Sequence, residues 1–174
     1  MPHGFLVSSR HSLPSPTLRG YAFQGLDLVI DDDGRRSYGG AVEAGEDGSY
    51  VSVSTTGRAA AIGTDRAAYS RLFVYRSGDR WVVGSSFIEV AEEAARNGWA
   101  LTPAPYRLQT FAMTTNIGNQ LVTHSTVFDE ISLLPADRWI QITRGAFRLK
   151  LSVRNHEAPV GGHYKERLAD FLKG

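Results

Sequence analysis

Short apolar runs separated by glycine and polar turn residues dominate the chain, a pattern typical of β-structure. A short strand is predicted over residues 5–9. A ten-residue strand is predicted over YAFQGLDLVI, residues 21–30, and the turn residues DDDG at 31–34 would end it in a solvated turn. The polar, glycine-rich segment of residues 35–48 then indicates a loop.

Three β-hairpins are predicted where two β-rich runs flank a short turn. The clearest is RLFVYRSGDRWVVGSS, whose apolar runs lie on either side of Ser77-Gly78-Asp79. The predicted strand pairs are residues 50–55 with 58–65, 72–75 with 81–83, and the two halves of RWIQITRGAFRLKL on either side of Arg144-Gly145.

Helices are predicted to be the minority. SFIE, residues 86–89, has the Ser-x-x-Glu form of a capping box, in which the serine accepts from a free helix amide and the glutamate reaches back. A helix is therefore predicted over residues 87–96, closed by Asn97-Gly98. A second short helix is predicted to open at Thr102-Pro103 and to end near residue 113.

The end of the chain carries an apolar stripe at helical spacing. The segment HYKERLADFLK follows the glycine-containing linker NHEAPVGG and predicts an amphipathic helix. Such a stripe needs a covering surface, and docking on a partner protein would supply one. The stripe consists of Tyr164, Leu168, Phe171 and Leu172.

These elements predict one antiparallel, β-rich domain of the α+β class. The expected division is an N-terminal arm at residues 1–20, the domain at 21–152, and a linker with the tail helix at 153–174. A length of 174 residues suits one domain with a substantial core.

Composition excludes several classes of function. Lysine and arginine number 19 against 18 acidic residues, so no global charge favours nucleic acid or an anionic membrane as partner. No apolar run is long enough for a membrane span or a secretory signal, so a soluble, cytoplasmic protein is expected. The chain has no cysteine, which removes disulfides, thiolate metal sites and a cysteine nucleophile.

The motifs that most often carry chemistry are absent or weak. Asp31, Asp32 and Asp33 are clustered carboxylates that suit Ca²⁺ or Mg²⁺, but they lack the spacing of a calcium loop. His124-Ser125 is merely an adjacent pair, and neither a G-x-S-x-G elbow nor a glycine-rich phosphate loop occurs. No zinc-ligand spacing links the five histidines His3, His11, His124, His156 and His163.

Two passages nevertheless resemble a known family. The first is TVFDEISLLPADRWIQI, residues 126–142, whose pattern resembles the segment that closes the N-terminal domain of asparagine synthetases and related class II glutamine amidotransferases. Asp137 replaces the usual glycine. The matching residues are Thr126, Phe128, Ile131, Leu134 and Pro135.

The second passage, residues 47–86, resembles the same family's strand, its Asp-Arg-x-Gly-x-x-Pro-Leu-Tyr-Tyr turn, its hairpin and its pair of small residues. Ala68 stands for the glycine, Arg71 for the proline and Val74 for the second tyrosine. Together the passages cover about residues 48–151. The matching residues are Gly48, Tyr50, Asp65, Arg66, Leu72, Phe73, Ser85 and Ser86.

The resemblance implies an N-terminal-nucleophile (Ntn) hydrolase-like fold, in which two antiparallel β-sheets are layered with helices. In that family a cysteine at position one of the mature chain attacks the amide of glutamine, and its own free amine serves as base. The released ammonia is used by an ATP-dependent synthetase domain.

This chain departs from that chemistry. Removal of Met1 would leave Pro2, which has neither thiol nor hydroxyl. The family's Arg-Gly-Pro-Asp and Asn-Gly-Glu motifs are missing, and Arg19-Gly20 is at best a remnant of the first. A hydroxyl nucleophile uncovered by self-processing is the alternative, and its candidates are Ser8, Ser9 and Thr17.

The resemblance therefore implies a degenerate amidotransferase domain without glutaminase activity. Its expected role is that of a scaffold or accessory domain of an ATP-dependent amide-forming synthetase, as in relatives that close β-lactam rings or cyclise peptides. The partner is a synthetase domain or subunit, in cis or in trans, and a homo-oligomer is also open.

No cofactor is expected on this chain, because no SGG-type pyrophosphate loop is present. ATP and Mg²⁺ are expected only on a synthetase that is separate, removed or lost. Two alternatives remain open: a stand-alone small-molecule-binding or interaction module that reuses the old glutamine cleft, and an active amidohydrolase with a nucleophile not yet placed.

Overall fold

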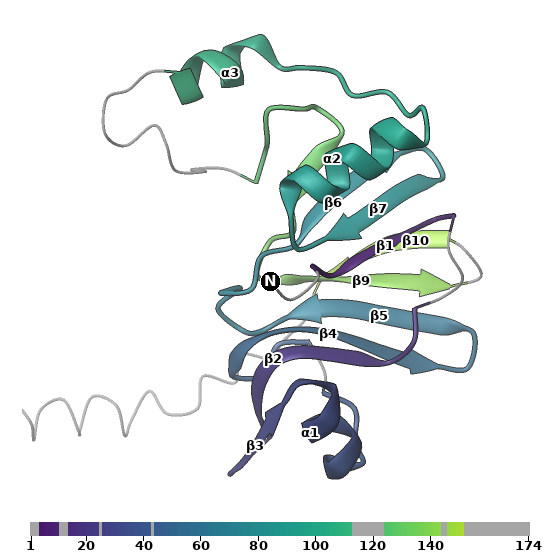
Figure 1. The fold of residues 1–174 in the computed structure, drawn as a ribbon, viewed down its shortest axis with the longest axis vertical. Helices are drawn as coiled ribbons and strands as arrows, with labels where there is room; N and C mark the ends of the chain where they lie inside the picture. Colours follow the sequence, from purple (N-terminus) through teal and green to yellow (C-terminus); the bar gives the residue numbers. More distant parts are fainter. Residues whose placement is uncertain are drawn as a thin grey trace, which may run out of the picture.

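The computed structural model describes residues 4–10, 14–24, 26–42, 44–112, 124–143 and 146–151. Ten strands and three helices lie within these ranges (Figure 1). In chain order they are β1 (Leu6–Ser8), β2 (Thr17–Gln24), β3 (Asp27–Ile30), α1 (Asp31–Tyr38), β4 (Gly48–Thr56), β5 (Ala59–Thr64), β6 (Phe73–Ser77), β7 (Arg80–Gly84), α2 (Phe87–Arg96), α3 (Pro105–Ala112), β8 (Ile131–Leu133), β9 (Arg138–Thr143) and β10 (Ala146–Leu151).

The strands form two antiparallel sheets. The smaller sheet has the order β1-β7-β6-β8, and the larger has the order β10-β9-β5-β4-β2-β3. The three helices of the described ranges are only 8 to 10 residues long. The predicted α+β class with two antiparallel sheets is therefore confirmed.

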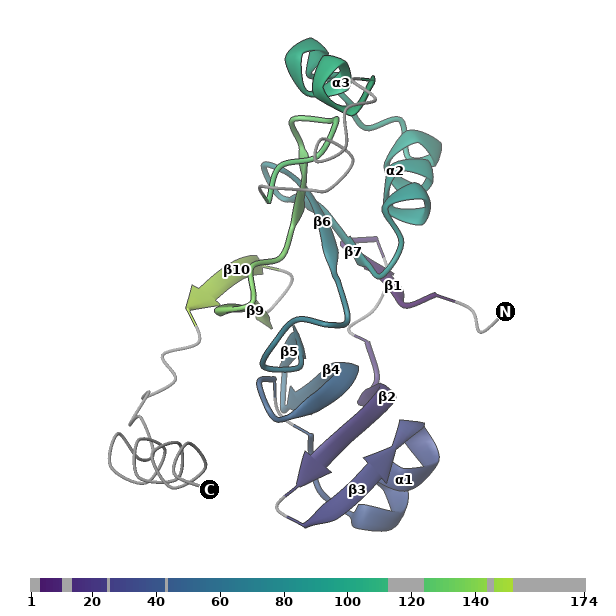
Figure 2. The ribbon, with the colours of Figure 1, turned by 90° about the vertical axis from the view of Figure 1, so that its left-hand side faces the viewer.

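Hydrophobic side chains join the two sheets and α2 into layers. Between the sheets, Val53 of β4 belongs to one buried cluster with Val74 and Val83 of the smaller sheet. On the other face of the smaller sheet, Tyr75 is buried with Val90 of α2. Because neighbouring strand residues point to opposite faces, β1, β6 and β7 each contribute to both clusters, whereas β8 contributes Ile131 to the cluster with α2. Figures 1 and 2 show α2 lying along β6 and β7.

A third cluster lies on the far face of the larger sheet. Tyr50, which alternates with Val51 along β4, is fully buried there beside α1 and the β2–β3 hairpin. The cluster consists of Leu18, Ala22, Val29, Val42 and Tyr50.

All three predicted hairpins are confirmed. Each closes through a two-residue connection, which gives the strands a fixed register. The closing pairs are Thr56 with Ala59 in β4–β5, Ser77 with Arg80 in β6–β7, and Thr143 with Ala146 in β9–β10.

The helix predicted over residues 87–96 is confirmed as α2. Ser86 Oγ accepts a hydrogen bond from the Glu89 amide at 3.3 Å, and Gly98 follows the helix in the left-handed region at φ +67°. The reciprocal half of the capping box is wrong, because the Glu89 carboxylate lies against Gly4 instead. The second helix, α3, begins two residues later than predicted, since Pro103 forms a bridge with Phe128.

The prediction for residues 21–48 is partly wrong. Residues 21–30 form a hairpin and not one strand, because Gln24 pairs with Asp27 and folds the apolar run back on itself. The predicted turn and the start of the predicted loop form helix α1. Three carboxylates in the first turn of α1 stabilise the helix, because they lie at the positive end of its dipole. At the other end the Gly39 N–H donates a hydrogen bond to Arg35 O at 3.1 Å.

The N-terminal segment is part of the sheets. The boundary predicted at residue 20 falls inside β2, and β1 pairs with β7 so that Val7 lies opposite Val83. The predicted linker and tail helix, with Tyr164, Leu168, Phe171 and Leu172, lie outside the described residues. Within those residues, every helix is too short and too polar to cross a membrane.

Candidate functional site

A cleft of about 760 Å³ lies beside the N-terminal end of β1. It lies where the edge of the smaller sheet meets β2 and β4 of the larger sheet, next to α1. Polar and charged side chains line much of it. Its walls are formed by Gly4, Phe5, Leu18, Arg19, Gly20, Asp31, Asp32, Asp33, Arg36, Val51, Ser70, Arg71 and Ser85.

The wall at β1 is closed by the end of β7. The Phe5 amide donates to Ser85 Oγ at 3.0 Å, and the Ser85 amide donates back to Phe5 O at 2.9 Å. A side chain at Gly4 would clash with the carboxylate of Glu89. The segment that enters β1 is thus held by two hydrogen bonds to Ser85, and a side chain at Gly4 would require the Glu89 carboxylate to move.

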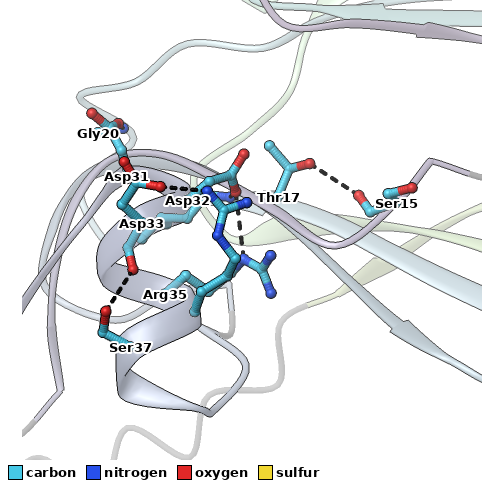
Figure 3. Close-up of polar contacts among 10 residues, drawn as sticks. Ser15, Thr17, Gly20, Asp31, Asp32, Asp33, Arg35 and Ser37 are labelled. Atoms are coloured by element: carbon cyan, nitrogen blue, oxygen red, sulfur yellow. Dashed lines mark hydrogen bonds and ion pairs between the residues drawn. The ribbon is translucent and has the colours of Figure 1, made fainter.

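Another wall is formed by carboxylates of α1 that accept hydrogen bonds from the backbone of β2 (Figure 3). β3 ends opposite Tyr21, so earlier residues of β2 have no strand partner on that side. The Gly20 amide donates to Asp31 Oδ1 and the Leu18 amide donates to Asp32 Oδ1, both at 2.7 Å. The first turn of α1 therefore satisfies backbone donors that a longer β3 would otherwise have paired.

Positive charge faces the same cleft. Arg36 lines the cleft and forms an ion pair with Asp33. Arg35 is not among the lining residues, and its Nε lies 3.4 Å from Asp32 Oδ1. Arg71 is exposed at the rim and has no hydrogen-bond or ion-pair partner among the described residues. The cleft can therefore offer both a guanidinium and carboxylates to a polar ligand.

The predicted remnant Arg19-Gly20 lies in this cleft. Gly20 has φ +105°, and a Cβ at this position would collide with the carbonyl oxygen of Ser49. Glycine is therefore required at this position, where the backbone of β2 lies close to that of β4.

The family-like turn after β5 is organised by one buried carboxylate. Asp65 is fully buried, and it accepts hydrogen bonds from the amides of Ala67, Tyr69 and Ser70 at 3.0 to 3.1 Å. Ala68 has φ +52°, a left-handed conformation that glycine adopts without strain. Ala68 stands where the resembled pattern has a glycine, and the backbone here has the left-handed conformation that favours glycine.

The neighbouring family-matching residues have structural roles. Arg66 is exposed and pairs with Asp47 at 3.4 Å. Leu72 is buried between the sheets, and Phe73 packs edge-on against Phe87 with ring centroids 5.8 Å apart. Ser86 caps α2, as described above.

The segment at 126–135 is held by one buried hydroxyl. Thr126 Oγ1 donates to Ile131 O at 2.8 Å, and it accepts from the Phe128 amide at 3.3 Å. The Phe128 ring stacks on Phe87, and Ile131 is buried in β8.

The Leu-Pro end of this segment connects the two sheets. The Leu134 amide donates to Leu72 O at 2.7 Å, which ties the two family-like passages together. Pro135 then begins the turn into β9, because its carbonyl accepts from the Arg138 amide at 3.0 Å. The two passages, 40 positions apart from residue 86 to residue 126, therefore meet in one packed unit.

Burial raises the pKa of Tyr50, one of the residues that match the family pattern. Desolvation raises the pKa of Tyr50 to about 12, even though its hydroxyl accepts from the Glu46 amide at 2.8 Å. This phenol stays neutral at physiological pH and acts as a core side chain with a polar anchor.

The hydroxyls of the cleft are not the predicted ones. Ser8, Ser9 and Thr17 are absent from the cleft walls, whereas Ser70 and Ser85 line them. Ser70 Oγ lies 3.3 Å from Ser49 Oγ, and Ser85 Oγ is occupied by the Phe5 amide. Among the described residues neither cleft hydroxyl contacts a histidine or a carboxylate that could activate it as a nucleophile.

Sequence reasoning missed most of the cleft. Asp31 to Asp33 were predicted as a solvated turn, but two of them bind strand amides and all three line the cleft. Their clustering just before a basic pair, Arg35-Arg36, was the available signal for a helix start. Within the described ranges no group of three histidine, aspartate or glutamate side chains is placed to hold a metal ion.

Comparison with family models, curated proteins and solved structures gives no match to this chain.

Proposed function

We propose that this chain is a degenerate, asparagine-synthetase-type glutamine amidotransferase domain with an Ntn-hydrolase-like fold, and that it lacks glutaminase activity. In this role it serves as a scaffold or accessory domain of an ATP-dependent amide-forming synthetase. ATP and Mg²⁺ would be held by that partner.

The observation that carries the proposal is the position of the cleft. It opens beside Gly4 and Phe5, at the N-terminal end of β1, where an Ntn hydrolase presents its nucleophile. Both family-like passages support the same unit, since Leu134 of one binds Leu72 of the other.

The loss of activity is supported by the chemistry of the cleft. The chain contains no cysteine, and the two cleft hydroxyls are engaged by Ser49 and Phe5. A retained cleft without a nucleophile suits binding better than amide hydrolysis.

A glutaminase assay on the purified chain tests this point. We expect no ammonia release from glutamine above the buffer rate. Ammonia release that disappears in Ser70→Ala or Ser85→Ala would overturn the proposal and establish an amidohydrolase.

The accessory role is tested by recovering the native protein from its own cells and measuring its intact mass and its companions by mass spectrometry. A synthetase fused or bound to the chain is the expected result. Recovery of the chain alone, at its own mass, would remove the accessory role.

The second candidate is a stand-alone small-molecule-binding module. It is favoured by the guanidinium of Arg71, which lines the same cleft as the carboxylates of α1, so that the cleft offers charge of both signs to a polar ligand. Ligand-induced shifts in melting temperature, lost in Arg71→Ala, would support this candidate.

A further inference from the structure

The β2–β3 hairpin carries an apolar face that the cleft does not use. Tyr21 pairs with Ile30 and Phe23 pairs with Leu28, so these four side chains lie on one face. Each is between 44% and 53% exposed. Together with Gly20 they line an apolar cavity of about 360 Å³. We name these four side chains the hairpin patch.

This hairpin is apolar on both faces. On the face opposite the patch, Ala22 and Val29 are buried with Tyr50. A sheet with one solvated face normally carries polar residues there, and two apolar faces indicate cover on both sides. Exposed apolar patches of this kind mark interaction surfaces.

The patch continues the face that the smaller sheet covers elsewhere. Val51 belongs to the cluster between the sheets and lies opposite Arg19, and Tyr21 is two residues further along the same strand. Residues two apart in a strand share a face. The smaller sheet has four strands against six in the larger, and it leaves the β2–β3 hairpin uncovered.

We propose that the hairpin patch is the seat of this chain's own C-terminal stripe, formed by Tyr164, Leu168, Phe171 and Leu172. The sizes agree, because a helix over residues 164–172 is about 12 Å long. The patch spans two strands about 4.8 Å apart with residues about 7 Å apart along each, before the side chains are added. This seat is inferred independently of the proposed function.

The chain leaves the larger sheet at the right end to reach this seat. Leu151, the last residue of β10, pairs with Arg138 at the start of β9. β9 and β5 are antiparallel, and the end of β5 pairs with β4 through Thr64 and Val51, which lies opposite Arg19. Leu151 and the patch therefore share one end of the sheet.

The linker is long enough for the remaining separation. From β10 to β3 there are five strand spacings, about 24 Å. Thirteen residue steps separate Leu151 from Tyr164 and span up to about 43 Å when extended. The tail can therefore cross the sheet with slack and without disturbing β10.

Charge at the rim agrees with this occupant. Asp31 borders the cavity over the patch, and Asp27 opens β3; both are exposed. The tail segment supplies three basic side chains against Glu166 and Asp170, namely Lys165, Arg167 and Lys173. Such rim charges fix orientation more than affinity.

The seat has a consequence for partner binding. The stripe cannot lie on the hairpin and on a synthetase at the same time. A partner that takes the stripe therefore uncovers the hairpin patch, and the two surfaces respond to the partner together.

Cysteine cross-linking in the full chain tests the seat, because the protein has no cysteine of its own. One variant carries Leu28→Cys and Leu168→Cys, joining the patch to the stripe. The matched control carries Leu28→Cys and Glu166→Cys, where residue 166 lies on the opposite side of the predicted helix. Leu28 is half exposed, so its replacement spares the core.

Both pairs have nearly the same tether, so a difference in rate reports orientation. We expect an intramolecular disulfide that forms about tenfold faster in the stripe pair, since cross-linking needs Cα atoms within about 7 Å. Equal rates in the two pairs overturn the proposal. A product of twice the chain mass also overturns it and places the stripe on a second copy.

Dye binding gives a second measurement that needs no cross-link. In Phe171→Ser/Leu172→Ser, removal of the stripe should uncover the patch and raise the fluorescence of the apolar dye ANS about twofold. The matched control, Glu166→Ser/Lys173→Ser, should leave it unchanged. Unchanged or lower fluorescence in the stripe variant means that the stripe did not cover the patch. Neither experiment depends on glutaminase activity or on a synthetase.

Discussion

The region from β4 to β8 and the region from β2 to α1 are both built from short strands and short helices, but different contacts hold them. In the first region, buried polar anchors serve their own loops, as Asp65 does for residues 65–70 and Thr126 for residues 126–131. In the second, Asp31 and Asp32 reach from a helix to the backbone of a separate strand, at the surface.

This difference decides how each region is encoded. A loop whose anchor lies within five residues forms from local sequence, so its signal is visible in the chain. A helix whose carboxylates need the amides of β2 depends on a strand being present first. The β2–β3–α1 region is thus specified by tertiary context, and its apolar outer face still lacks a cover within the described residues.

The largest expected effect is the loss of the Asp65 anchor. Asp65→Ala leaves three loop amides without an acceptor in a buried site, which should lower the free energy of unfolding by about 3 kcal/mol or more. Urea unfolding followed by circular dichroism measures the change. The control is Asp47→Ala, which removes only an exposed ion pair with Arg66 and should cost less than about 1 kcal/mol.

Equal effects of these two aspartate variants would break the comparison, because the buried anchor would then contribute no more than a surface charge. A change in the slope of the unfolding curve would instead indicate that the variant alters the denatured or native state.

The surface anchor of the second region should have a smaller effect. Asp32→Ala removes the acceptor for the Leu18 amide and the partner of Arg35, and it should cost about 1–2 kcal/mol. Asp33→Ala is the matched control, since Asp33 is almost fully exposed and pairs only with Arg36 along the helix. Its cost should stay within about 0.5 kcal/mol. Hydrogen exchange at the Leu18 amide locates the effect, and unchanged exchange there in Asp32→Ala would contradict it.

A backbone substitution sharpens the comparison with the family pattern. Ala68→Gly should raise the free energy of unfolding by about 0.5 kcal/mol, because relief of the left-handed strain at φ +52° exceeds the entropy that glycine adds to the unfolded chain. Ala67→Gly, one residue earlier and without a positive φ, should lower it by a similar amount. Paired urea curves decide the signs, and a loss of stability in both variants would show that Ala68 is not strained.

Much of the fold was accessible from the sequence where the signals were local. The turn Ser77-Gly78-Asp79 placed the β6–β7 hairpin, and the cap at Ser86 placed the start of α2. The β2–β3 hairpin was missed because residues 21–30 as a whole are apolar enough for one strand, although Gln24-Gly25 and Asp27 interrupt the run where the chain reverses.

Only parts of the cleft could be predicted from the sequence. Its walls combine Phe5 with Ser85, which are 80 positions apart, and Gly20 with Asp31. No local rule brings such pairs together, since their contact depends on how β1 and β2 are placed in two different sheets. The family resemblance pointed to Arg19-Gly20, whereas Ser70 and Arg71 carried no sequence signal of their own.

The smallest expected effect comes from Glu130, an anchor in the first region whose hydrogen bonds with Thr102 are exposed. It tests whether the strength of an anchor depends on its exposure or on the region in which it lies. Burial acts to raise the pKa of Glu130, but the hydrogen bonds that Thr102 donates outweigh it and hold the pKa below its ordinary value. A carboxyl whose pKa is lowered in the folded state stabilises the protein at pH values above the unfolded pKa of about 4.3, and this contribution is lost as the pH falls through the folded pKa.

Because the hydrogen bonds between Glu130 and Thr102 are exposed, Glu130→Gln should lower the free energy of unfolding by well under about 1 kcal/mol at neutral pH. Urea midpoints from pH 7 downward should show the wild type and the variant converging on the acid side. A difference that stays constant into acid would mean that the ionised carboxylate does not strengthen this anchor.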